Sequence, residues 1–124
     1  MGTLRGKNAL GRLGEDLACE YLRSRGHTVL ARNWRSAHLE IDLITRASDG
    51  LHFAEIKSRT APLAADPLEQ VGPAKQKKIT AAARRFLSGF GEDLEVWFDV
   101  VSVVFDGPSA DIEYFPGAWL PIRV

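Results

Sequence analysis

Residues 39–59 read LEIDLITRASDGLHFAEIKSR, and this stretch decides the fold. Its alternating apolar residues predict two β-strands, at 39–46 and 51–58, and the Asp49-Gly50 pair between them favours a tight hairpin turn. In the first strand, simple alternation gives two faces. Leu39, Ile41 and Leu43 are expected on one face, and Glu40, Asp42 and Ile44 on the other.

The same hairpin carries charges where a sheet between two helices needs apolar residues. A turn at Asp49-Gly50 pairs residue 42 with residue 57, and a turn at Ser48-Asp49 pairs residue 42 with residue 55. Either register gathers Asp42, Glu55 and Lys57 on one face with Glu40 nearby, whereas a three-residue loop needs a bulge to do so. The structural alternative is a cross-strand salt bridge between Asp42 and Lys57 with Glu55 in solvent.

Two carboxylates beside a lysine suit metal-assisted hydrolysis of a phosphodiester. Mg²⁺ prefers oxygen ligands and keeps several waters, so one or two carboxylates are enough to hold it. The metal activates a water and offsets the charge of the transition state. A nearby lysine orients that water, acts on its proton or neutralises the phosphate.

The rest of the chain predicts a three-layer α/β domain with a mixed, mainly five-stranded sheet and the order α-β-β-β-α-β-β. Helices are expected at about 8–25 and 74–90 because apolar residues recur there at three- and four-residue spacing. Further strands are expected at 28–34 and 95–105, with a short last strand at 111–115, and residues 59–73 read as a loop. We expect one domain over 1–124, with its core at about 8–105 and a C-terminal strand and apolar tail at 111–124.

Composition excludes several classes of protein. The 124 residues include one cysteine, Cys19, which reads as a small buried helix residue, and three separated histidines, so neither disulfides nor a structural zinc site is expected. No apolar run spans a bilayer and no signal segment is visible, which favours a cytoplasmic protein without membrane contact. The net charge is zero, yet residues 1–91 carry a balance of +6 and residues 92–124 a balance of −6.

Several motifs in order resemble the YraN-like family of small uncharacterised proteins, over residues of about 11–101. Asp42 followed by Glu55-Ile56-Lys57 also resembles the core of the PD-(D/E)XK nucleases. The matching stretches are GRLGE at 11–15, RNWR at 32–35, EIDLI at 40–44, FAEIKSR at 53–59, Lys75, and FDVV at 98–101. The family usually has Gly before Glu40 and Arg before Phe98, where this chain has Leu39 and Trp97.

The resemblance implies a restriction-endonuclease-like fold, similar to archaeal Holliday junction resolvases and tRNA-splicing endonuclease domains. It implies a catalytic set of Glu15, Asp42, Glu55 and Lys57, in which Asp42 and Glu55 hold Mg²⁺ or Mn²⁺. Taken alone, Glu15 would read as an ordinary helix acid. Basic residues form a candidate phosphate contact or, alternatively, a solvated helix face. These are Arg59, Lys75, Lys77 and Lys78, with Arg84 and Arg85 beside them.

The leading functional hypothesis is a metal-dependent endonuclease acting on branched or single-stranded DNA. The alternative is a nucleic-acid-binding module of a repair, recombination or DNA-uptake machine, and a third reading is a scaffold whose acidic C-terminal quarter meets a basic partner. The analogy with resolvases also suggests a homodimer, through Phe115, Trp119, Leu120 and Ile122. Among other residues, Asp99 is expected to be structural, and Asn33 and Trp34 are expected to pack in a strand. His38 and His52 flank the carboxylate strands and are expected at the surface, the alternative being that either supports the site from behind the carboxylates.

Overall fold

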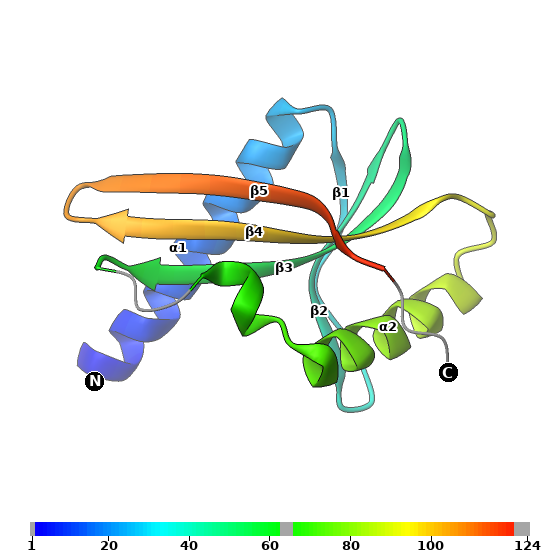
Figure 1. Cartoon of the computed structure of the whole chain (residues 1–124), viewed down its shortest axis with the longest axis horizontal. Helices are drawn as coiled ribbons and strands as arrows, with labels where there is room; N and C mark the ends of the chain where they lie inside the picture. The colour runs from blue at the N-terminus through cyan, green and yellow to red at the C-terminus, as the bar shows by residue number, and fades with distance from the viewer. Residues whose placement is uncertain (1, 63–65, 121–124) are drawn as a thin grey trace.

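Five strands form one mixed sheet in the order β1-β2-β3-β4-β5, which confirms the α/β class and the predicted element order (Figure 1). The computed structural model describes residues 2–62 and 66–120. Strands β3 and β4 are parallel and the other neighbours are antiparallel. The elements are α1 (Gly2–Ser24), β1 (Thr28–Ser36), β2 (Leu39–Ala47), β3 (Gly50–Thr60), the 3₁₀ helix η1 (Pro67–Gln70), α2 (Pro73–Ser88), β4 (Val96–Asp106) and β5 (Ser109–Trp119).

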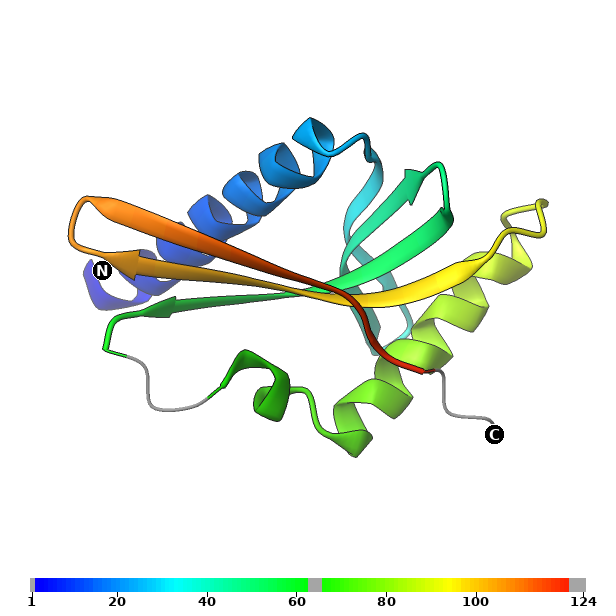
Figure 2. The same cartoon turned by 45° about the horizontal axis from the view of Figure 1, so that its top comes forward.

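Helices cover both faces of the sheet, so the molecule has three layers (Figure 2). One buried cluster joins α2 to the sheet through Ile79, Ala82 and Ala83, the apolar stripe expected of that helix. A second cluster joins α1 to the opposite face through Ala18, Cys19 and Leu22. The parallel β3–β4 pair needs a crossover, and η1 and α2 lie within it.

Helix α1 packs closely against β3 because it carries a glycine at the contact. A Cβ atom added at Gly14 would overlap the Ser58 side-chain hydroxyl and lie 3.0 Å from Ser58 Cβ. Gly11, one turn earlier, would meet nothing within 4 Å. The glycine at position 14 therefore sets how near α1 approaches the strand that carries Glu55 and Lys57.

The hairpin pairs Ala47 with Gly50 and continues to Leu43 opposite Ala54. This register selects the Ser48-Asp49 turn from the two registers that the sequence allowed. The simple alternation predicted for β2 is wrong, because Ile41 and Ile44 both pack on the α2 side while Leu43 packs on the α1 side. Strand β2 changes face at residue 42. The residue opposite on the adjacent strand β1 is Asn33, whose φ of 50° is in the left-handed region.

Some element boundaries also differ from the predictions. Helix α1 begins at Gly2 rather than near residue 8, and β5 is a full partner of β4 with 11 residues rather than a short strand. The predicted loop at 59–73 contains η1, whose first turn is capped by Asp66 Oδ1 accepting from Leu68 N at 2.8 Å. None of the helices in the described part of the chain is long and apolar enough to cross a membrane.

Candidate functional site

The candidate site lies where the pairing of β2 with β3 ends. Beyond the Leu43–Ala54 pair, the backbone N–H of Ile56 donates to Asp42 Oδ2 at 2.9 Å. The Asp42 carboxylate thus accepts a hydrogen bond from a backbone N–H of β3 that lies beyond the last residue pair of β2 and β3. Asp42 and Ile56 line an open hollow of about 290 Å³ together with Gly11, Glu15 and Ser58.

Glu55 is the buried carboxylate of the site, with 7% of its side chain exposed. Its Oε1 atom receives two ammonium groups, from Lys57 of the same strand at 3.7 Å and from Lys75 of α2 at 3.3 Å. Glu55 is therefore not a solvated residue, and the salt bridge of Lys57 goes to Glu55. Both features differ from the structural alternative, in which Lys57 pairs with Asp42.

Asp42 and Glu55 lie close enough to share a hydrogen bond, which requires a proton on one of them. Burial and the charge of Glu55 raise the pKa of Asp42 from its usual 3.8 to about 7. The hydrogen bond from Ile56 N and the charge of Lys75 act in the opposite direction but offset only part of this shift. Asp42 is therefore partly protonated near neutral pH, because burial and the charge of Glu55 disfavour its ionised form.

Glu15 reaches the same hollow from α1 and is fixed by two residues of β1. Its Oε1 atom accepts from Arg32 Nε at 3.1 Å and from Asn33 Nδ2 at 2.7 Å. Arg32 also contacts Asp16 at 2.7 Å, so it links two acids of α1 to β1. Asn33 was expected to serve only strand packing, whereas its left-handed backbone accompanies a side chain that contacts Glu15. Trp34 does pack as expected, edge-on against Phe86.

The oxygen donors of Asp42 and Glu55 fit Mg²⁺ or Mn²⁺, because both ions accept carboxylates with water in the remaining positions. The raised pKa of Asp42 supports this fit, since a divalent cation would offset the burial and the repulsion from Glu55 that raise it. No group of three or more His, Cys, Asp or Glu side chains could hold a metal in the described ranges 2–62 and 66–120. Glu15 therefore lines the hollow without joining the pair as a third ligand.

The basic residues divide into two groups. Lys75 enters the site itself through its contact with Glu55, while Lys77 and Lys78 are exposed on α2. Arg59 lines a different hollow, of about 310 Å³, together with Asp111 and Glu113 of β5. The exposed lysines near the start of α2 thus lie on the element that contacts the carboxylate pair, and Arg59 lies beside acidic residues.

A buried polar network occupies the other end of β3, and sequence patterns did not reveal it. His52 is 2% exposed, contrary to the expected surface position, and its ring nitrogens lie 2.6 Å from Asp99 Oδ2 and 2.7 Å from Asp49 Oδ1. Asp99 also accepts from Tyr114 OH at 2.6 Å and from Gly117 N at 2.9 Å. Asp99 is thus structural, as expected, because it joins β3, β4 and β5.

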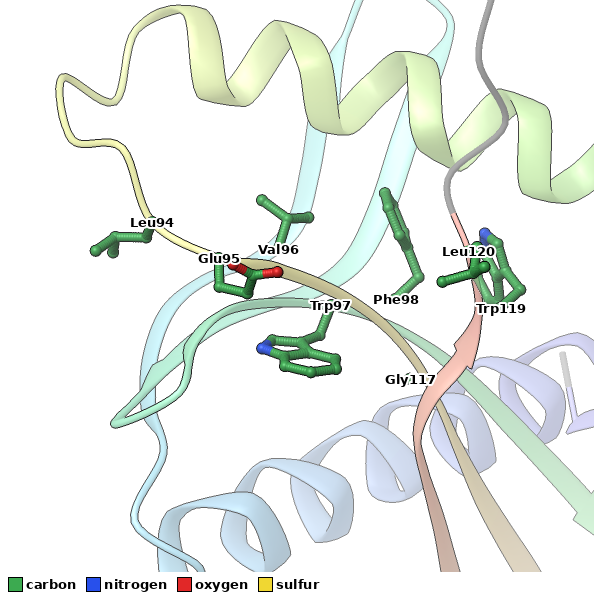
Figure 3. A pocket seen from close by; sticks show the side chains of 8 residues that line it. All are labelled: Leu94, Glu95, Val96, Trp97, Phe98, Gly117, Trp119 and Leu120. Carbon is green, nitrogen blue, oxygen red and sulfur yellow. The ribbon is translucent and has the colours of Figure 1, made fainter.

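A larger hollow, of about 390 Å³, lies away from the carboxylates, between β4 and the end of β5 (Figure 3). Figure 3 shows Phe98 pointing toward α2 and Trp97 pointing to the other side of β4. Trp97 Nε1 donates to Asp49 O at 2.9 Å, so this departure from the family pattern stabilises the hairpin turn and lies outside the candidate site. The other departure, Leu39, is 9% exposed and packs in the α2-side core.

The apolar C-terminal residues are only partly available as a surface. Phe115 and Trp119 pack against the α2-side core. Leu120 is 86% exposed, and Ile122 lies outside the described residues. The two aromatic residues thus contribute to the fold itself, and Leu120 is the exposed member of the set.

Comparison with known proteins identifies the relatives of this chain. A UPF0102 protein of Anaeromyxobacter dehalogenans is 41% identical over 92% of this chain and 86% of its own length. A UPF0102 protein of Syntrophotalea carbinolica is 42% identical over 90% of this chain and 91% of its own length, and one of Bacteroides thetaiotaomicron is 33% identical over 92% and 94%. The family model "Uncharacterised protein family UPF0102" matches residues 14–103, which include all four predicted catalytic positions. The chain therefore belongs to the uncharacterised protein family UPF0102, as its resemblance to the YraN-like proteins indicated.

Proposed function

We propose that this protein is a Mg²⁺- or Mn²⁺-dependent endonuclease that hydrolyses phosphodiester bonds in branched or single-stranded DNA in the cytoplasm. One observation carries the proposal: the partly buried Asp42, which lines an open hollow, contacts the buried Glu55, and Glu55 pairs with Lys57. Holding two acids in contact and away from water is costly, so a fold that retains the ionisable Asp42 beside Glu55 favours a use for its charge.

Asp42 and Glu55 would hold the metal, which when bound lowers the pKa of a water and neutralises charge on the phosphate. Lys57 reaches the pair from the second position after Glu55, on the same face of β3. From there its ammonium can orient the attacking water or bind a phosphate oxygen. Glu15 would stay fixed by Arg32 and Asn33 at the edge of the hollow, where it can accept a hydrogen bond from a water.

The exposed lysines of α2, Lys77 and Lys78, support the choice of nucleic acid as substrate. Lys78 lies three residues after Lys75, so it extends the positive charge of Lys75 along one side of the helix that contacts Glu55, and Lys77 adds charge elsewhere on the same helix; such charges can contact a phosphate backbone. The described elements include no helix that projects alone to enter a major groove, so recognition of DNA shape is favoured over recognition of sequence.

A nucleic-acid-binding module that does not cut is the second candidate function. It is favoured by the salt bridges of Lys57 and Lys75, because two ammonium groups already neutralise Glu55 without a metal. Under either proposal, a homodimer formed through the apolar C-terminal residues would use Leu120, which is the exposed member of that set among the residues the structure describes.

Isothermal titration calorimetry with Mn²⁺, followed by single-turnover cleavage of a four-way DNA junction, tests the proposal. The nuclease should bind Mn²⁺, cut the junction, and lose both properties in Asp42→Asn. Glu40→Gln is a matched control on the same strand, since Glu40 is exposed and pairs with Arg35 at 3.6 Å. DNA binding without Mn²⁺ binding or cleavage would instead support the binding module.

A further inference from the structure

Two lysines converge on one oxygen of Glu55, and they differ in how firmly they are held. Lys57 lies on the central strand β3 and has 21% of its side chain exposed. Lys75 lies in the first turn of α2, is 48% exposed, and reaches the same Oε1 atom at the shorter distance of 3.3 Å. Lys75 therefore makes the closer contact while keeping about half of its side chain in water.

The backbone that carries Lys75 is anchored to the segment that precedes α2. Gln76 Nε2 donates to Val71 O at 2.8 Å and Gln76 N donates to Gly72 O at 3.0 Å, which ties the first turn of α2 to the segment before it. Val71 is 2% exposed and belongs to the α2-side core. Because the backbone is fixed, a change at Lys75 is a movement of its flexible side chain.

A divalent cation at Asp42 and Glu55 would meet both ammonium groups at short range. Like charges that close repel, so at least one lysine must leave the Oε1 atom. Lys75 can leave at the lower cost, because an exposed ammonium regains its hydration, whereas Lys57 is largely enclosed.

We propose that Lys75 is a displaceable counter-ion of Glu55: it neutralises the carboxylate while the site is metal-free, and it swings into solvent when a divalent cation binds. Its ammonium then lies beside the site, on the side of α2 that also carries Lys78 three residues later, where a nucleic-acid phosphate can take the place of Glu55. Metal binding would thus prepare the phosphate contact. This inference rests on the proposed metal site and adds the regulation of that site.

Mn²⁺ affinity measured by calorimetry on the full chain gives the first test. Lys75→Ala removes the competing cation, so Mn²⁺ should bind about 5- to 10-fold tighter than to the wild type, the size expected of one partly exposed charge at this distance. Lys77→Ala, with the same charge change on the exposed part of the same helix, should stay within about twofold of the wild type.

The outcomes separate this inference from the proposed function. If Lys75→Ala binds Mn²⁺ no more tightly than Lys77→Ala does, the displaceable counter-ion is overturned and the metal site is not. Mn²⁺ binding that survives in Asp42→Asn, or that is absent from the wild type and Lys75→Ala alike, overturns the metal site and this inference with it.

Chemical labelling of lysines in the unmodified protein gives a test that needs no Lys75 variant. Reductive methylation followed by mass spectrometry should label Lys75 several-fold faster in Mn²⁺ than in EDTA, because an ammonium released from Glu55 is more accessible. Lys77 serves as the internal reference and should label equally in both conditions, and in Asp42→Asn the effect of Mn²⁺ on Lys75 should vanish. Equal labelling of Lys75 with and without Mn²⁺, in a wild type that binds Mn²⁺, refutes the displacement.

Discussion

Replacing Asp42 with Asn should stabilise the metal-free protein at pH 8. An asparagine keeps a side-chain oxygen to accept from Ile56 N, the bond that Asp42 makes at 2.9 Å. Its amide can also donate to Glu55, which the ionised aspartate cannot do. The substitution therefore retains the structural contact of Asp42 and removes only the charge that burial and Glu55 disfavour.

The magnitude follows from the pKa of Asp42, which is raised from 3.8 to about 7. Each pKa unit corresponds to about 1.4 kcal/mol, so the free-energy cost of ionising Asp42 in the fold is at most roughly 4 kcal/mol. Well below pH 3.8 the folded and the unfolded chain are both protonated at this carboxyl, and there is no cost. As the pH rises from 4 to 7 the unfolded chain loses its proton first, so stability falls, and the full cost is reached above pH 7.

Because local relaxation and water reduce such costs, we expect Asp42→Asn to gain about 1–3 kcal/mol in free energy of unfolding at pH 8. The gain should fall below half of that value at pH 5. Urea titrations in EDTA at the two pH values measure it, with equal m-values as the check for an unchanged native state. Glu40→Gln, exposed on the same strand, should change stability by less than about 0.5 kcal/mol. A variant that is less stable than the wild type at pH 8, or whose gain is the same at both pH values, would refute the reasoning.

Three further predictions concern packing, the histidine network and Lys57. Gly14→Ala should destabilise the protein by about 1–3 kcal/mol in thermal or urea unfolding, because its Cβ would overlap the Ser58 hydroxyl, whereas Gly11→Ala should be neutral or stabilising; equal effects would contradict the close contact. In an NMR pH titration, His27 should have a pKa below 6.5, owing to its burial and the nearby charge of His52, while the pKa of His52 should lie above 6.5, because its hydrogen bonds with two aspartates outweigh its burial; the opposite order would be contrary to the network. Lys57→Ala should lower single-turnover cleavage of the four-way junction by roughly 10²- to 10⁴-fold while the thermal midpoint changes little; a destabilised variant that still cuts would leave Lys57 a structural residue.

The fold could be predicted from local patterns to the extent that those patterns are regular. The hairpin and the apolar stripe of α2 both follow from spacing and turn residues. Alternation failed at one place, residue 42, where β2 changes the face it presents to the core. The change of face lies opposite Asn33 of β1, and the left-handed backbone of Asn33 has no signal in the pattern of apolar residues.

The candidate site was predictable in part for the same reason. Asp42, Glu55 and Lys57 lie on neighbouring strands of one hairpin, so the register alone brings them near one another. No local pattern predicts contacts between elements that are far apart in the sequence. Lys75 could be placed on a helix by its spacing but not against Glu55, and the His52–Asp99 contact joins two strands 47 residues apart in the chain.

The end of the β2–β3 pairing gives Asp42 two roles that the sequence alone cannot separate. The Ile56 N–H would be left without this partner if Asp42 were apolar, so an acceptor at position 42 is needed for the strand itself. A neutral acceptor would meet that need at lower cost, since an ionised carboxylate here repels Glu55. The feature of Asp42 that the strand does not need is its negative charge. An oxygen-coordinated divalent cation requires that charge of its ligands. Stability at pH 8 in EDTA and Mn²⁺ binding should therefore move in opposite directions in Asp42→Asn, with the variant more stable and unable to bind. A purely structural Asp42 would give no such opposition.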